Sequence, residues 1–127
     1  MQDPIVPKFI NDLKLAGKPY LIDGSRIVCG GAVMLTVEPD IDAEFVTEYR
    51  LELPDSLTVP QEFPYVVLFV TSVFGVGVLR QIGGILKKCL FDGKPFTKDI
   101  GDYRLKGFSE GDQRVLLFEH FHPRPTQ

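Results

Sequence analysis

Tryptophan is absent from this sequence, cysteine occurs only twice, and there is no long run of charges of one sign. Cys29 and Cys89 are too few for the disulfide framework of a small secreted domain, so we expect both thiols to be reduced and buried. The first residues also lack the basic start and apolar run of a signal peptide. Together these absences predict a cytoplasmic protein.

An excess of basic residues is also lacking. Lysine and arginine number 14 against 17 aspartate and glutamate residues, which gives a formal net charge of −3, and the sequence pI is about 5.3. Nucleic acids and anionic membranes attract basic surfaces. We therefore expect neither nucleic acid nor a membrane as a partner.

What the chain does contain is enough apolar material for one core. Of its 127 residues, 44% are hydrophobic and 24% are charged, which is ordinary for a globular domain of this length. We expect 1–127 to form a single domain. Residues 123–127 hold two prolines and are expected to form a flexible tail.

The segment 63–79 has no charged residue and is rich in Val, Leu, Phe and Tyr. A membrane-spanning helix needs ~20 consecutive apolar residues, whereas this run is shorter and contains Pro64 and two glycines. Its β-branched content favours a strand. We therefore predict a buried central strand over 65–74, followed directly by a helix.

Periodic spacing predicts an element on each side of this run. Between 45 and 53, apolar and charged residues alternate, which is typical of a strand with one buried and one solvated face. Over 78–90, Leu79, Ile82 and Leu86 recur at helical spacing, which predicts an amphipathic helix.

Turn and cap residues predict the remaining elements, which are a helix over 7–16, strands over 20–22 and 26–37, and a hairpin of 103–108 with 114–121. Gly30-Gly31 interrupts the strand over 26–37 and indicates a bulge or a close backbone approach. This order predicts an α+β fold. Its mainly antiparallel sheet would have about five strands, with an N-terminal helix and one amphipathic helix packed on the sheet.

The sequence contains no complete motif for binding a cofactor. Gly75-Val76-Gly77 follows the predicted strand, where a dinucleotide-binding loop would lie, but Arg80 occupies the third glycine position of that motif. No serine lies in a nucleophile-elbow context. The sequence therefore predicts no cofactor and no catalytic residue.

His120 and His122 are the two histidines of the chain, and both fall at the end of the last predicted strand. Side chains two apart on a strand share a face, so both imidazoles could approach one metal ion. Zinc needs further ligands, however, and Glu119 would point to the opposite face. We therefore expect an edge-strand pair rather than metal ligands.

Phenylalanines are concentrated in the C-terminal third of the chain, beyond what one small face readily buries. Exposed apolar patches mark partner or dimer surfaces. On this ground we expect a non-enzymatic protein–protein interaction module that forms a homodimer and acts as an adaptor, an inhibitor or a chaperone-like accessory protein. It would associate with itself through an exposed sheet edge or through the C-terminal phenylalanines, and the interface residues would include Phe108, Phe118 and Phe121.

The alternative is a small-molecule-binding protein or a small enzyme with a pocket between the sheet and the helix at 78–90. A hot-dog-like thioesterase, in which a sheet wraps one apolar helix, has a similar arrangement. Its candidate ligand-binding groups would be Cys29, Tyr49 and His120. A closed, filled core favours the interaction module, whereas an apolar cavity with converging polar groups favours the enzyme.

Overall fold

The computed structural model describes residues 4–29, 33–54 and 59–120. Within these ranges the chain forms three helices and seven strands, in the order α1 (Ile5–Leu15), β1 (Tyr20–Asp23), β2 (Arg26–Cys29), β3 (Val33–Glu38), β4 (Glu48–Pro54), α2 (Val59–Phe74), α3 (Val76–Asp92), β5 (Phe96–Ile100), β6 (Tyr103–Glu110) and β7 (Gln113–His120).

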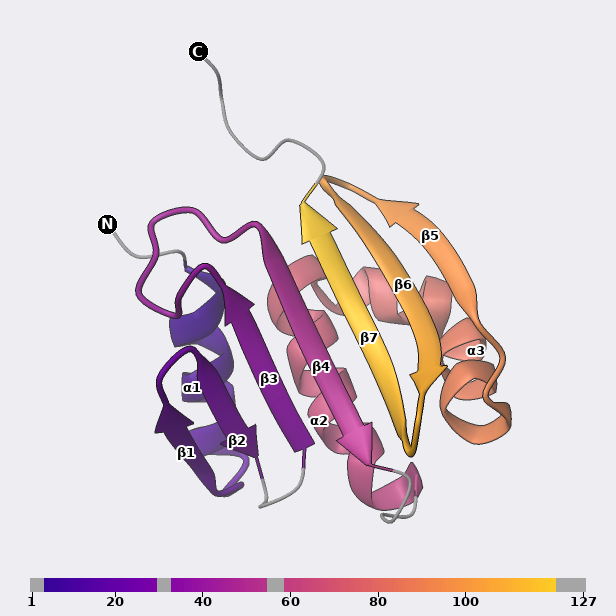
Figure 1. The fold of residues 1–127 in the computed structure, drawn as a ribbon, viewed down its shortest axis with the longest axis horizontal. Coiled ribbons are helices and arrows are strands. Elements are labelled where there is room, and N and C mark those ends of the chain that lie inside the picture. The colour runs from indigo at the N-terminus through magenta and orange to yellow at the C-terminus, as the bar shows by residue number, and fades with distance from the viewer. Residues whose placement is uncertain (1–3, 30–32, 55–58, 121–127) are drawn as a thin grey trace.

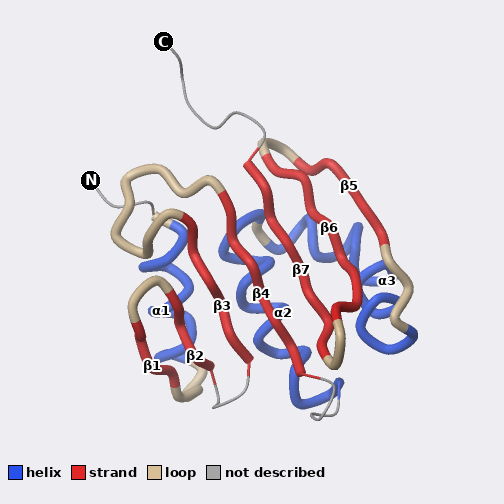
Figure 2. The backbone as a smooth tube through the Cα atoms, in the orientation of Figure 1, coloured by secondary structure: helices blue, strands red, loops and turns tan. Residues whose placement is uncertain are grey.

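The seven strands form one antiparallel sheet in the order β1-β2-β3-β4-β7-β6-β5. Strands β1 to β4 and strands β5 to β7 are two meanders, and the pairing of β4 with β7 joins them. All three helices lie on one side of the sheet (Figures 1 and 2). The predicted α+β class and antiparallel sheet are confirmed, but the sheet has seven strands rather than about five.

Two features account for the larger number of strands. The strand predicted over 26–37 is in fact two antiparallel strands, β2 and β3, and the glycine pair expected inside it lies outside the described residues. The second feature is β5, which the sequence pattern did not indicate. Its apolar residues are at its two ends, and the three residues between them are exposed.

The prediction of a central strand over 65–74 is wrong, because this segment belongs to helix α2. In a run that is almost entirely apolar, a period of two and a period of 3.6 cannot be distinguished from composition. The buried positions do recur at helical spacing, since Tyr65, Val66, Phe69 and Val70 face the core. Gly75, with φ of 93°, separates α2 from α3.

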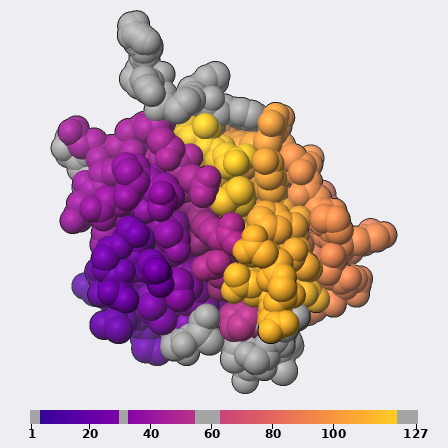
Figure 3. Space-filling view, in the orientation of Figure 1, coloured from indigo at the N-terminus to yellow at the C-terminus, as the bar shows by residue number. Residues whose placement is uncertain are grey.

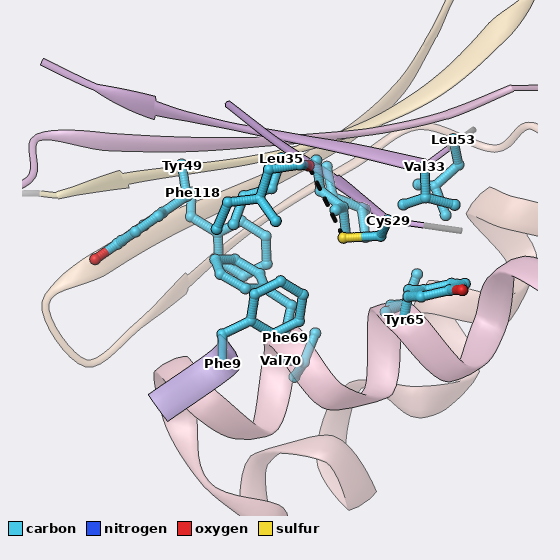
Figure 4. Packing of buried hydrophobic residues seen from close by; sticks show 14 of the residues in the cluster. Phe9, Cys29, Val33, Leu35, Tyr49, Leu53, Tyr65, Phe69, Val70 and Phe118 are labelled. Carbon is cyan, nitrogen blue, oxygen red and sulfur yellow. Dashed lines mark hydrogen bonds between the residues drawn. The ribbon is translucent and has the colours of Figure 1, made fainter. Parts of the chain in front are cut away.

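Phe69 on α2 lies at the centre of the core (Figure 4). Its ring makes edge-to-face contacts with Phe9 of α1, Tyr49 of β4 and Phe118 of β7, at centroid distances of 5.1, 5.3 and 5.0 Å. Aromatic pairs of this kind add ~0.5–1.5 kcal/mol each beyond the burial of their area. One side chain therefore connects two helices to both halves of the sheet.

The other two helices agree with the sequence within a few residues at each end. α3 buries Ile82, Leu86, Cys89 and Leu90 and contacts both α2 and β6. Both cysteines are buried and unlinked, as predicted. None of the helices in the described part of the chain has the length and apolar composition to cross a membrane.

We predict that Leu86→Ala lowers the free energy of unfolding by ~2–5 kcal/mol, as for other buried leucines. Leu86 is fully buried in the core cluster, and truncation would leave a cavity beneath α3. The control is Lys87→Ala at the exposed next position, which should change stability by less than ~0.5 kcal/mol. Urea unfolding measures both. Equal midpoints for the two variants would show that this face of α3 is not packed.

Gly107 on β6 allows the closest approach between the sheet and its neighbours. A Cβ atom there would overlap the ring of Phe96 and would lie 2.9 Å from Sγ of Cys89. The Phe96 ring on β5 and the thiol on α3 therefore occupy the space that a side chain would need. In contrast, a Cβ at Gly84 in α3 would meet nothing within 4 Å.

These two glycines should respond to alanine in opposite directions. Gly107→Ala overpacks its site and should destabilise the fold by ~1–3 kcal/mol. Gly84→Ala reduces the backbone freedom of the unfolded chain and should therefore stabilise the folded protein by ~0.5–1 kcal/mol. Thermal unfolding of both variants is the measurement. A Gly107→Ala protein as stable as wild type would mean that β5 and α3 do not close over this position.

Candidate functional site

The outer face of the sheet, opposite the helices, is the surface seen in Figures 1 and 3, and no described helix covers it. Side chains alternate between the two faces of a sheet. In β4, Tyr49, Leu51 and Leu53 are fully buried on the inner face, so Glu48, Arg50 and Glu52 project outward. The alternation predicted over 45–53 is therefore confirmed from Glu48 onward, whereas residues 45–47 precede the strand and Val46, not Phe45, is the fully buried residue there.

The strand registers align the outward side chains in rows across the sheet. One row is largely apolar and contains Leu21, Val28, Met34, Glu52, Val115 and Phe108. The next row is mixed and contains Asp23, Arg26, Thr36, Arg50, Leu117, Lys106 and Thr97. The third row is charged and contains Glu38, Glu48, Glu119, Arg104 and Asp99.

Three carboxylates are direct cross-strand neighbours in the charged row. Glu48 lies between Glu38 on β3 and Glu119 on β7. Like charges directly opposite each other in a sheet are destabilising. Partial burial, together with the charges of Glu119 and Glu38, raises the pKa of Glu48 above its ordinary value, although Arg50 and Lys106 act in the opposite direction.

Ion pairs hold most of the other charges on this face. Arg50 bonds Glu52 with its Nε at 3.0 Å and also contacts Glu110. Lys106 Nζ lies 3.1 Å from Glu119. In the described chain the Glu48 side chain has no ion pair or hydrogen bond. Glu48 is therefore a partly buried carboxylate that has neither an ion pair nor a hydrogen bond in the described chain, although the charges of Arg50 and Lys106 act on it from a distance.

A hollow of about 320 Å³ opens beside Glu48, at the end of the sheet where β4 and β7 meet. Its lining is Thr47, Glu48, Arg104, Glu119 and His120. The backbone fixes this corner, because the N–H of His120 donates to the carbonyl of Thr47 and the N–H of Thr47 donates to the carbonyl of Glu38, each at 2.9 Å.

The ring of His120 is held between Phe45 and Tyr103, with centroid distances of 4.7 and 4.9 Å. Its Nδ1 atom is buried and has no hydrogen-bond partner among the described residues. His122, the other candidate ligand, lies outside them. In the part of the chain that is described, no group of three or more His, Cys, Asp or Glu side chains is placed to hold a metal ion.

Two of the three candidate ligand-binding groups are core residues. Cys29 and Tyr49 are fully buried on the inner face, and Figure 4 shows Cys29 above Tyr65 of α2. Burial raises the pKa of Cys29 to about 12, which leaves its thiol protonated and weakly reactive. Tyr49 lies near the ring of Tyr103, which in turn contacts His120, whereas Cys29 is on the distant strand β2.

The phenylalanines expected at an interface have different positions. The prediction of Phe118 as an interface residue is corrected, because Phe118 is fully buried and its ring packs against Phe69 and Phe74 in the core. Phe108 lies partly exposed on the outer face, which suits an interface residue. Phe121 lies outside the described residues.

The space between α3 and the sheet, where the alternative function needs a pocket, holds packed side chains. Leu86 and Cys89 are fully buried there, and the Phe96 ring and the Cys89 thiol fill the space above Gly107. Burial also raises the pKa of Cys89, although Arg114 acts in the opposite direction.

Sequence reasoning identified the charged face of β4 but not the site that it forms. Glu48 and Glu119 are far apart in the chain and become neighbours only through the pairing of β4 with β7. The one available signal was the alternation around Glu48, which indicates a solvated face but not its cross-strand partner. Comparisons with protein families, curated proteins and solved structures found no match to this chain.

We predict that Glu48→Gln stabilises the fold at pH 7 by roughly 0.2–1 kcal/mol, the size of a like-charge cross-strand effect. The folded-state pKa is raised, so the cost of the carboxylate is present above that pKa and is relieved as pH falls through it. The advantage of the variant should therefore shrink between neutral pH and pH 4.5.

Urea unfolding at several pH values measures this difference. Glu52→Gln is the matched comparison, four residues further along the same face of β4. It should lose stability at pH 7 because Glu52 accepts hydrogen bonds from Arg50 and Gln113. A Glu48→Gln protein that is less stable than wild type, by the same amount at every pH, would contradict the prediction.

Proposed function

We propose that this chain is a small non-enzymatic interaction module that binds a segment of a partner protein on the outer face of its sheet. The observation that carries the proposal is the hollow beside Glu48. There, a carboxylate without a partner in the described chain lies at the margin of a face that no described helix covers. A segment of another molecule would then cover the outer face of the sheet, as the helices cover its inner face.

The chemistry of the hollow favours a basic side chain as the occupant. A lysine or arginine there could bond Glu48 and offset its repulsion with Glu38 and Glu119. Hydrogen bonds to charged groups contribute ~1.5–3 kcal/mol, more than bonds between neutral groups. Arg104, which also lines the hollow, is already paired with Asp99 at 2.8 Å.

The surface next to the hollow favours apolar residues in the same partner segment. Leu117 lies in the row beside the carboxylates, and Phe108 lies one row further. Both are partly exposed. A segment with one basic residue followed by apolar residues therefore matches the order of chemistry across the face, from charge at the hollow to apolar surface.

Selection from a displayed peptide library on the immobilised protein tests this proposal. We expect the enriched peptides to combine a basic residue with neighbouring apolar residues. A synthetic peptide of that sequence should then bind Glu48→Gln about tenfold more weakly or worse, as expected for the loss of a charged hydrogen bond. Asp112→Asn, in the turn at the other end of β7, is the control and should bind as wild type does.

The dependence of binding on pH has a defined sign. A cationic partner favours the ionised form of Glu48, so affinity should fall as pH drops through the raised pKa of that carboxyl. Enriched peptides without a basic residue, or equal affinity for Glu48→Gln, would overturn the proposal. Lysine amide binding as tightly as the peptide would also overturn it, in favour of a small-molecule site.

A further inference from the structure

The two edges of the sheet are protected to different degrees. The edge strand β5 carries Lys98 and Asp99, and Asp99 is paired with Arg104 at 2.8 Å. The other edge, β1, exposes Leu21 and Ile22, which are 66% and 46% accessible. Charged side chains on an edge strand discourage pairing with another chain. β1 lacks this protection until its last residue, and no described strand lies on its outer side.

We propose that β1 pairs with the β1 strand of a second copy of this chain, antiparallel about a two-fold axis at Leu21. The two sheets then form one continuous sheet across the dimer. This inference goes beyond the partner-binding face proposed above, because it concerns an edge of the sheet, whereas the hollow lies at β4 and β7 in the middle of the strand order. It uses none of the residues around the hollow.

The hairpin between β1 and β2 determines which backbone groups are available. Asp23 pairs with Arg26 across a two-residue turn that includes Gly24 at φ 65°. The two residues that flank such a turn exchange backbone hydrogen bonds, and hydrogen-bonded pairs then alternate with non-hydrogen-bonded pairs along the two strands. The N–H and C=O groups of Leu21 therefore point toward β2, and those of Tyr20 and Ile22 point outward.

These outward groups match in a pairing centred on Leu21. Tyr20 of one copy then lies opposite Ile22 of the other, at two symmetric positions, and each such pair exchanges both of its backbone hydrogen bonds. Opposed residues in a sheet share a face, so Leu21 meets Leu21 on the outer face and Tyr20 meets Ile22 on the inner face. A pairing centred on Ile22 would instead place Leu21 opposite Asp23.

Charge also favours a second copy as the occupant. Lys18 lies just before β1, with its Nζ 5.3 Å from the centroid of the Tyr65 ring, and Asp23 is the last residue of β1. Antiparallel pairing brings the Lys18 end of one segment to the Asp23 end of the other, so opposite charges meet at both ends of the joined strands. A parallel arrangement would bring like charges together. The edge is therefore complementary to itself in one orientation.

The small contact area available at this edge limits the strength of the association. β1 has four residues, and Leu15, 79% exposed at the end of α1, adds apolar surface nearby in the chain. Such a contact is smaller than the ~1,200–2,000 Å² of a stable interface. The dimer should therefore be weak, reversible and dependent on concentration.

Sedimentation equilibrium from low micromolar to near-millimolar concentration tests the proposal. The wild-type mass should rise from 14.3 kDa toward twice that value. Leu21→Lys should remain at 14.3 kDa, whereas Thr97→Lys on the other edge should associate as wild type does. A wild-type mass that stays at 14.3 kDa throughout, or a Leu21→Lys protein that still dimerises, would overturn the proposal.

Disulfide trapping tests the register. Leu21→Cys should form a disulfide-linked dimer under mild oxidation, because directly opposed Cβ atoms lie ~4.5–5.5 Å apart. Ile22→Cys should not, because its two copies would be diagonal neighbours ~7–8 Å apart. Cys29 and Cys89 are buried and should not interfere. Trapping of Ile22→Cys but not Leu21→Cys would overturn this register. The peptide binding proposed above does not depend on either result.

Discussion

Between β4 and β7 the sheet joins two antiparallel units, each of which is continuous in the chain. Strands β1 to β4 pair with their sequence neighbours, and so do β5 to β7, but β4 and β7 are separated by both long helices and two strands. This non-local pairing requires the closure of a long loop before its contacts form. It also aligns Tyr49 with Phe118, so that Phe69 of α2 contacts both rings. The aromatic core, the rows of the outer face and the hollow all depend on it.

The connection between the two meanders also explains why one face of the sheet is covered and the other is not. α2 and α3 lie within this connection and α1 precedes the first meander, and all three are on the inner side (Figure 2). Apart from Val115 on the outer face, the buried side chains of the strands consequently point one way. The side chains of the outer face must therefore be compatible with water. Charged side chains held in ion pairs, such as those of Arg50 and Lys106, meet this need over much of the face. Antiparallel sheets with one solvated face commonly have this division.

Features that depend on local periodicity could be predicted from the sequence, and features that depend on the partner of each strand could not. The alternation around Tyr49 and the stripe through Ile82 and Leu86 gave a correct strand and a correct helix, because charged residues there distinguish the two faces. The run around Phe69 contains no such contrast, and its helix was predicted as a strand. The neighbourhood of Glu48 and Glu119 could not be predicted at all, since it arises from the order of the strands. For the same reason Phe118 was expected at a surface and lies in the core.

In the charged row, one side chain lacks the pairing of opposite charges that its neighbours have. In this row Arg104 is matched by Asp99 on the neighbouring strand β5, and Glu119 is matched by Lys106 on the neighbouring strand β6. Glu48 is placed between two carboxylates, Glu38 and Glu119, at the junction on which the sheet depends. Partial burial, and then the charges of these two neighbours, raise its pKa. A glutamine would have nearly the same shape without the repulsion. Proteins tend to break such local rules at functional sites and to compensate for the cost elsewhere. The edge-to-face contacts of Phe69 with Tyr49 and Phe118, beneath the same two strands, provide such compensation.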